Sequence, residues 1–279
     1  MVDWRTHPLL PGPATPRIAV WVAVWAAVWV AASLAGCASS SRSPAALAGA
    51  RVQRVAVAPM NIVLALPAEL ESSAGSVQTA LVEYLSFHGK AVVEIDYRTG
   101  RSLWRESMQE VIRTKKPQSF ESAARVYVGR LRAHGEFDAL VIPSIFLQNV
   151  ETRTSATLAR WDGARERVRI ERHVPGATTC EQGYRTKAAS ILVKVFDAEG
   201  ELLHSAQSGL ELVEHIEVRS NEEKGGGWRT CEWVTNTPAL DDPERIMEGI
   251  ARGLDPFLPE RIPEPHEIGA ESRESRNAD

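Results

Sequence analysis

The sequence contains no run of basic residues and few cysteines. Only 3 of its 279 residues are Cys, and 32 Lys and Arg against 36 Asp and Glu give a net charge of −4. Proteins that bind nucleic acid carry clustered Lys and Arg to neutralise phosphates, so this composition argues against nucleic acid as a partner. Three cysteines are too few to staple a small disulfide scaffold, so the fold must depend on an apolar core.

The motifs of common catalytic centres are also missing. The chain has no HExxH helix, no GxSxG elbow, no GxxxxGK[ST] loop and no CxxC pair. Gly225–Gly227 lack the preceding strand and the following lysine-bearing helix that a phosphate loop needs, so they are interpreted as a loop tip. No two histidines share metal-ligand spacing. The sequence therefore predicts no catalytic residue, no metal site and no cofactor.

Carboxylates are the only candidate catalytic groups that are plentiful in the sequence, with 36 Asp and Glu. They cluster at two places, Glu211, Glu214 and Glu217, and Asp241, Asp242 and Glu244. A pair of carboxylates can hydrolyse a glycosidic bond, but only at a separation that sequence does not reveal. Such clusters are typical of solvated faces and of helix starts. A hydrolase acting on peptidoglycan or polysaccharide is therefore the alternative to a non-enzymatic protein.

An uncharged apolar stretch occupies residues 18–33 and is followed by Leu34, Ala35, Gly36 and Cys37. These four residues resemble the bacterial lipobox. The resemblance implies that residues 1–36 are a signal peptide, and that Cys37 carries a diacylglyceryl group and an amide-linked fatty acid such as palmitate. Each buried methylene contributes about 0.8 kcal/mol, so two or three chains make a firm membrane anchor. The alternative is a transmembrane segment, which needs about 20 apolar residues.

The residues after Cys37 predict its destination and the domain boundaries. Ala38 and Ser39 stand where an inner-membrane retention signal has aspartate, which favours a lipid anchor in the outer membrane of a Gram-negative bacterium, facing the periplasm. Small polar residues over 37–50 predict a flexible tether. Residues 51–258 form the predicted periplasmic domain, and the charged residues 259–279 predict a disordered tail.

Hydrophobic periodicity predicts the elements of that domain. Strands are predicted at 54–60, 91–95 and 137–150, helices at 77–88, 102–113, 120–133 and 243–258, and antiparallel hairpins around Trp161-Asp162-Gly163 and around 197–200. Pro143 inside the third strand suggests a bulge or an edge. The predicted fold class is α/β (α+β), a mixed β-sheet with antiparallel hairpins, covered by about four helices.

The two remaining cysteines, Cys180 and Cys231, lie in polar stretches on either side of one predicted hairpin. An exported protein meets an oxidising compartment, which favours a Cys180–Cys231 disulfide. Two free thiols, or a pairing of Cys180 with His173, are the alternatives. Trp228 and Trp233 flank Cys231. They form either an interaction hot spot or a small local core over the sheet edge.

Three short stretches together resemble a known group of proteins. Val55–Pro59, residues 137–145 and the hairpin at Asp197–Glu201 are similar to the lipoprotein domains related to the curli secretion protein CsgG, the penicillin-binding-protein activator LpoB and the amino-terminal domain of TolB. The resemblance spans residues 52–258. It implies a non-enzymatic protein that activates a cell-wall synthase, joins a translocation complex or forms an oligomeric secretion pore.

The chain departs from this group by long insertions at 160–187 and 219–240, each with one cysteine. A pore hairpin needs a continuous apolar face, whereas the first hairpin carries Arg165, Glu166, Arg167 and Arg169. We therefore expect an envelope lipoprotein that binds or scaffolds another cell-envelope component, as a regulator of a cell-wall synthase or as an assembly or transport accessory. A hydrolase and an oligomeric secretion subunit are the alternatives, and the partner and oligomeric state stay open.

Overall fold

The structure is a computed structural model and describes residues 43–114, 119–152, 158–172, 185–221 and 228–260. The predicted signal peptide, the lipobox with Cys37, Cys180 and most of the predicted tail lie outside the described residues. The described elements are α2 Pro44–Arg51, β1 Arg54–Val57, a 3₁₀ turn Ala68–Leu70, α3 Ala74–Phe87, β2 Ala91–Glu94, α4 Tyr97–Arg113, α5 Phe120–Arg132, β3 Ala139–Glu151, β4 Leu158–Trp161, β5 Ala164–Arg167, β6 Ile170–Arg172, β7 Arg185–Asp197, β8 Leu202–Leu212, β9 Glu214–Asn221, β10 Trp228–Thr235 and α6 Pro243–Leu254.

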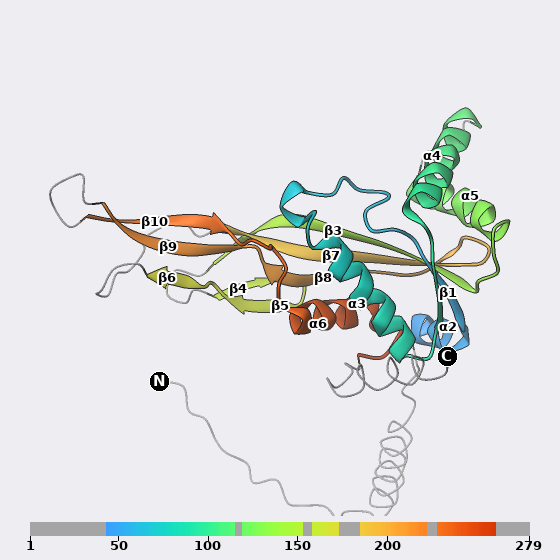
Figure 1. Cartoon of the computed structure of the whole chain (residues 1–279). Helices are drawn as coiled ribbons and strands as arrows, with labels where there is room; N and C mark the ends of the chain where they lie inside the picture. The colour runs from blue at the N-terminus through green and yellow to red at the C-terminus, as the bar shows by residue number, and fades with distance from the viewer. Residues whose placement is uncertain (1–42, 115–118, 153–157, 173–184, 222–227, 261–279) are drawn as a thin grey trace, which may run out of the picture. The chain divides into compact units, whose positions relative to one another are not determined.

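A five-stranded sheet in the order β2-β1-β3-β7-β8 forms the centre of the fold (Figure 1). Strand β1 pairs in parallel with β2 and β3, whereas β3, β7 and β8 are antiparallel. The parallel pairs follow from the helical crossovers between β1, β2 and β3. The antiparallel pair β7–β8 follows from the tight turn that contains Gly200, at φ 81°. The predicted α+β class with a mixed sheet is confirmed.

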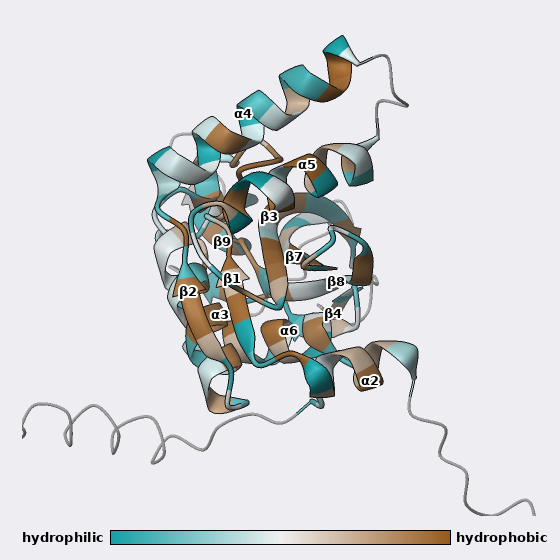
Figure 2. Ribbon diagram, turned by 90° about the vertical axis from the view of Figure 1, so that its right-hand side faces the viewer, coloured by the Kyte–Doolittle hydropathy of each residue, from teal (hydrophilic) through white to brown (hydrophobic). Residues whose placement is uncertain are grey.

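Helices cover both faces of this sheet (Figure 2). Val55 and Val57 belong to the core shared with α3 and α6, whereas Ala56 and Ala58 belong to the core shared with α4 and α5. This alternation follows from the two-residue period of a strand. Each core contains a completely buried tyrosine, Tyr84 in the first and Tyr127 in the second.

Two expectations about local structure were wrong. Residues 44–50, expected in the tether, belong to helix α2, whose cap Ser43 accepts the Ala46 N–H at 3.1 Å. The helix expected to start after Ser76 begins at Ala74, with Ser73 at its N-cap. The Ser73 side chain instead accepts the Leu240 N–H at 3.3 Å, which ties α3 to the segment before α6.

Pro143 lies in the central strand without a bulge, because the β3–β7 register is continuous there. Its carbonyl accepts the Asn61 N–H at 3.1 Å and therefore faces the β1 side of β3. Strand β1 has already ended at Val57, so the missing proline N–H leaves no ladder bond unmade. The expectation of an edge is therefore correct only at Pro143 itself, where β1 no longer pairs with β3, whereas β3 as a whole is a central strand.

The Asp162-Gly163 turn joins β4 and β5, as expected. Both residues have positive φ, 40° and 78°, as the two central residues of a type I′ hairpin turn require. This hairpin lies against β8 at Gly209, where a Cβ would come within 2.6 Å of the Trp161 Nε1 atom. Trp161 donates from Nε1 to the Ala189 carbonyl at 3.1 Å, so a glycine allows the hairpin to dock on the sheet.

A separate three-stranded sheet has the order β10-β9-β6. Strand β9 continues the chain from β8 after Val213 and pairs antiparallel with β10 and parallel with β6. Figure 1 shows β9 and β10 reaching beyond the helices that cover the five-stranded sheet. Two strands of this sheet, β6 and β10, come from the two predicted insertions.

Candidate functional site

The three-stranded sheet has one apolar face. Ile216 and Val218 on β9 lie opposite Trp233 and Cys231 on β10, and all four belong to or pack on one apolar cluster that includes Trp161. Trp233 therefore contributes to a local core, which was one of the two interpretations of this residue. The side chain of Trp228 and the whole of Cys180 lie outside the described residues, so their parts in a hot spot and in a disulfide with Cys231 stay predictions.

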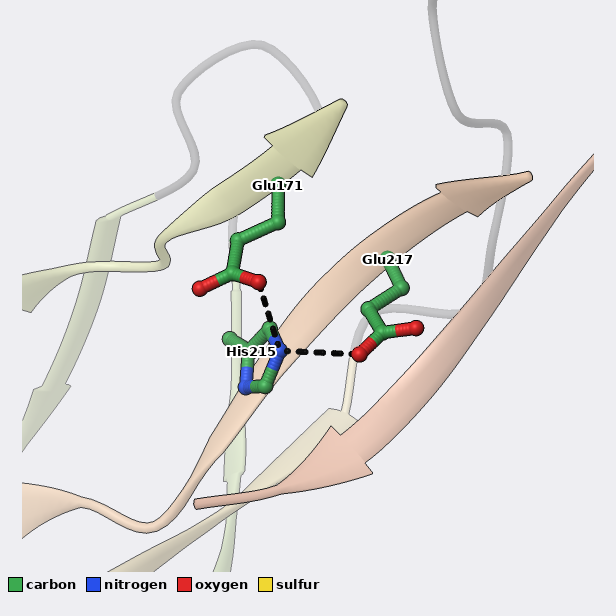
Figure 3. A group of neighbouring side chains, drawn as sticks. All are labelled: Glu171, His215 and Glu217. Carbon is green, nitrogen blue, oxygen red and sulfur yellow. Dashed lines mark ion pairs between the residues drawn. The ribbon is translucent and has the colours of Figure 1, made fainter. Parts of the chain in front are cut away.

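The opposite face of this sheet, here called the charged face, carries Glu171, His215 and Glu217 (Figure 3). Glu171 on β6 is the register partner of Glu217 on β9. His215 precedes Glu217 by two residues, so both side chains project from the same side of the strand. The parallel pairing of β6 with β9 thus brings together three residues that are separated by up to 46 positions in the chain.

His215 lies at the centre of this group. It is only 6% exposed, and its Nε2 atom lies 3.6 Å from Glu171 Oε2 and 3.5 Å from Glu217 Oε1. Its other ring nitrogen, Nδ1, lies 2.7 Å from Asn236 Oδ1. The Asn236 amide nitrogen donates to the Leu212 carbonyl at 3.0 Å, so the Asn236 oxygen is the atom that faces the imidazole, and Nδ1 carries a proton.

An arginine holds the second oxygen of each glutamate. Arg169 Nε lies 3.1 Å from Glu171 Oε1, and Arg219 Nε donates to Glu217 Oε2 at 2.8 Å. The hydrogen bond from Arg219 to Glu217 raises the pKa of the Arg219 guanidinium. Each carboxylate therefore gives one oxygen to an arginine and presents the other to His215.

This group was not predictable from the sequence. The histidine spacing indicates no metal site, and Glu217 was expected to belong to a carboxylate cluster with Glu211 and Glu214. Only the alternation His215-x-Glu217 was visible as a pattern on one strand face, and nothing in the sequence predicted that β6 would pair with β9. Of the described residues, these three are the group of His, Cys, Asp and Glu whose ligand atoms lie within 4.8 Å of one another.

Of the other expected carboxylates, Glu211 lies beside Asp241, whereas Glu214 has a separate contact. Glu214 accepts the Lys187 N–H at 2.9 Å. Glu211 is 6% exposed and accepts the Asp241 and Asp242 N–H groups at 3.1 and 3.4 Å, just before α6. Burial, followed by a hydrogen bond with the Asp241 carboxyl group, raises the pKa of Glu211 to about 8.

Glu166 lies near Glu211 and is also largely withdrawn from water. Burial raises its pKa, although the Leu212 N–H at 2.8 Å and Arg245 Nη1 at 2.9 Å act in the opposite direction. Glu211 therefore contacts the segment just before α6, including the Asp241 carboxyl group, and Glu166 contacts Arg245 in the first turn of that helix. Their arrangement is that of an anchor for this helix.

Two surface cavities lie elsewhere, on the side of α4 and α5. One, of about 350 Å³, is lined by residues including Arg54, Val93 and His134. The other, of about 300 Å³, is lined by α4 and α5 residues including Met108 and Ile112, which are 37% and 53% exposed. Neither cavity is lined by Glu166 or Glu211.

No protein-family model matches this chain, and no curated protein shows significant sequence similarity to it. The resemblance to the CsgG, LpoB and TolB group therefore stays an expectation based on three short stretches. Among the described residues, no helix combines the length and the apolar character needed to cross a membrane.

Proposed function

We propose that this protein is an outer-membrane lipoprotein, anchored through Cys37, that binds or scaffolds another component of the cell envelope without catalysis. The partner contacts the charged face of the β6–β9–β10 sheet. The observation that carries this proposal is that β9 and β10 extend beyond the helical layers (Figure 1) while their apolar side is already packed. The remaining face presents charges to solvent.

The exposure and charge of this face support a polar contact surface. Arg219 on β9 and Glu232 on β10 are exposed, and Glu232 is the register partner of Glu217. Among the strands that the structure describes, β10 is also an edge of its sheet, and an edge strand offers N–H and C=O groups to a strand from another chain. A partner with a polar surface and an extended segment therefore matches both features.

The hydrolase alternative is supported by the raised pKa values of Glu211 and of neighbouring Glu166, because perturbed carboxylates often mark catalytic sites. Against it, Glu211 is occupied by the backbone N–H groups of Asp241 and Asp242. These contacts favour binding over catalysis.

The test is crosslinking and pull-down of the lipidated protein from membranes, with two charge-reversal variants. Glu232→Lys changes the charged face, and Arg105→Glu changes an exposed residue of α4 as a matched control. We expect Glu232→Lys to lower recovery of the partner by about tenfold, in line with loss of complementary charge at an interface, and Arg105→Glu to leave it unchanged. Equal recovery with both variants would contradict a contact through the charged face, and ring-shaped oligomers without a partner would favour the secretion subunit.

A further inference from the structure

We propose that Glu171, His215 and Glu217 form a binding site for a divalent transition-metal ion, with Zn²⁺ as the ion that best fits the ligand set. This inference concerns the charged face but does not depend on the partner proposed above. It also goes beyond the sequence, which predicts no metal site.

The first argument is the buried Nε2 atom of His215. Among the described residues, this atom has no hydrogen-bond partner, although buried polar atoms are normally satisfied. Because Nδ1 is the protonated nitrogen facing Asn236, a neutral His215 directs the Nε2 lone pair between two carboxylate oxygens (Figure 3). A lone pair facing two negative groups needs a cation between them.

That cation can be a proton on Nε2 or a metal ion, and the distances favour the metal. A protonated imidazole would draw one carboxylate to about 2.7–2.9 Å, whereas the two oxygens lie nearly equally at 3.6 and 3.5 Å. Zn²⁺ binds imidazole nitrogen and carboxylate oxygen at about 2.0–2.2 Å in a tetrahedron, which separates neighbouring ligand atoms by roughly 3.4 Å. The two separations between His215 Nε2 and the carboxylate oxygens match this edge length.

The surroundings match a metal centre as well. The hydrogen bond from Nδ1 to Asn236 sets the imidazole tautomer, and Arg169 and Arg219 orient the two carboxylates by their second oxygens. Groups that orient the ligands in this way are typical of metal sites. Asn236 is in turn fixed by the Leu212 carbonyl.

The ligand types define the class of ion. Imidazole favours Zn²⁺ and its neighbours in the transition series over Mg²⁺ and Ca²⁺, which prefer sites made of oxygen alone. Two carboxylates balance the charge of a divalent ion. Three protein ligands leave one tetrahedral position for water or for a group from another molecule.

The test uses the purified lipidated full chain in detergent, treated with a chelator and dialysed. Isothermal titration calorimetry with ZnCl₂ measures affinity and stoichiometry, and thermal unfolding with and without Zn²⁺ gives an independent reading. Glu171→Gln and Glu217→Gln each remove one ligand charge at nearly constant shape. Glu232→Gln is the matched control, because this exposed glutamate lies on the same face opposite Glu217.

We expect one Zn²⁺ per chain, at least tenfold weaker binding in each ligand variant, unchanged binding in Glu232→Gln, and no comparable effect of MgCl₂ or CaCl₂. The unfolding temperature should rise with Zn²⁺ in the wild type and in Glu232→Gln only. Absence of stoichiometric binding by the wild type would overturn the proposal. So would equal Zn²⁺ affinity of the wild type and a folded ligand variant, since the ion would then bind elsewhere.

Discussion

Replacing Glu211 with glutamine should change how the stability of this protein depends on pH. In the folded protein burial raises the pKa of Glu211 to about 8, whereas an unfolded glutamate titrates near 4.3. Between these values the folded state binds more protons than the unfolded state, so stability falls as pH rises. The contribution is fully present below about pH 4.3 and is lost as pH rises through about 8.

The magnitude follows from linkage. One proton bound only in the folded state lowers the free energy of unfolding by about 1.4 kcal/mol per pH unit, or about 3 kcal/mol between pH 5 and pH 7.5. Glutamine resembles the protonated carboxyl group and can accept the Asp241 and Asp242 N–H groups through its amide oxygen. Between pH 5 and pH 7.5, the free energy of unfolding of the Glu211→Gln variant should therefore rise by about this amount relative to that of the wild type.

Urea denaturation of both proteins at half-unit pH steps measures the difference directly, and the titrations of groups that do not interact with Glu211 cancel to first order. Glu244→Gln, an exposed change in the first turn of α6, serves as the control and should run parallel to the wild type. A constant difference between Glu211→Gln and wild type over the whole interval would refute the raised pKa and the burial that causes it.

Two further predictions concern docking and anchoring. Gly209→Ala places a Cβ 2.5 Å from the Ala164 Cβ and should destabilise the protein by about 1–3 kcal/mol. The control Gly129→Ala in α5 meets nothing within 4 Å and should stabilise the protein by up to about 1 kcal/mol. Urea midpoints compare the two variants, and equal effects would contradict the close approach of the β4–β5 hairpin to β8. Cys37→Ser should leave an uncut, unlipidated precursor, visible by mass spectrometry of whole cells, and normal processing of this variant would contradict the lipid anchor.

Elements that depend on neighbouring residues were predictable from the sequence. The two positive φ angles of the turn at Asp162-Gly163 follow from the preference of Asp-Gly for such turns, and the start of α6 follows from Asp242 capping a helix whose first residue is proline. Helix α4 shows the limit of this reasoning. Its periodicity was correct, but Met108 and Ile112 are exposed, because periodicity marks a helix face and does not say how far a neighbouring layer covers it.

The separate sheet and its charged face depend on contacts between distant segments. Ile216 and Trp233 are recognisably apolar in sequence, but their pairing across β9 and β10 was not predictable from either strand. The local signal His215-x-Glu217 is common on strand faces and indicates nothing by itself. This pair becomes part of a candidate metal site only because Glu171 on β6 lies beside it.

The amino-acid order alone determined the alternation of strands and helices, the two hairpin turns and the α+β class, since these depend on periodicity and on the backbone preferences of Gly, Pro and Asp. Tertiary pairing determined which side chains meet. A one-residue slip of β6 along β9 would move Glu171 to the apolar face, so the grouping of Glu171 and Glu217 around His215 depends on the burial of Ile170 and Ile216, which holds that register.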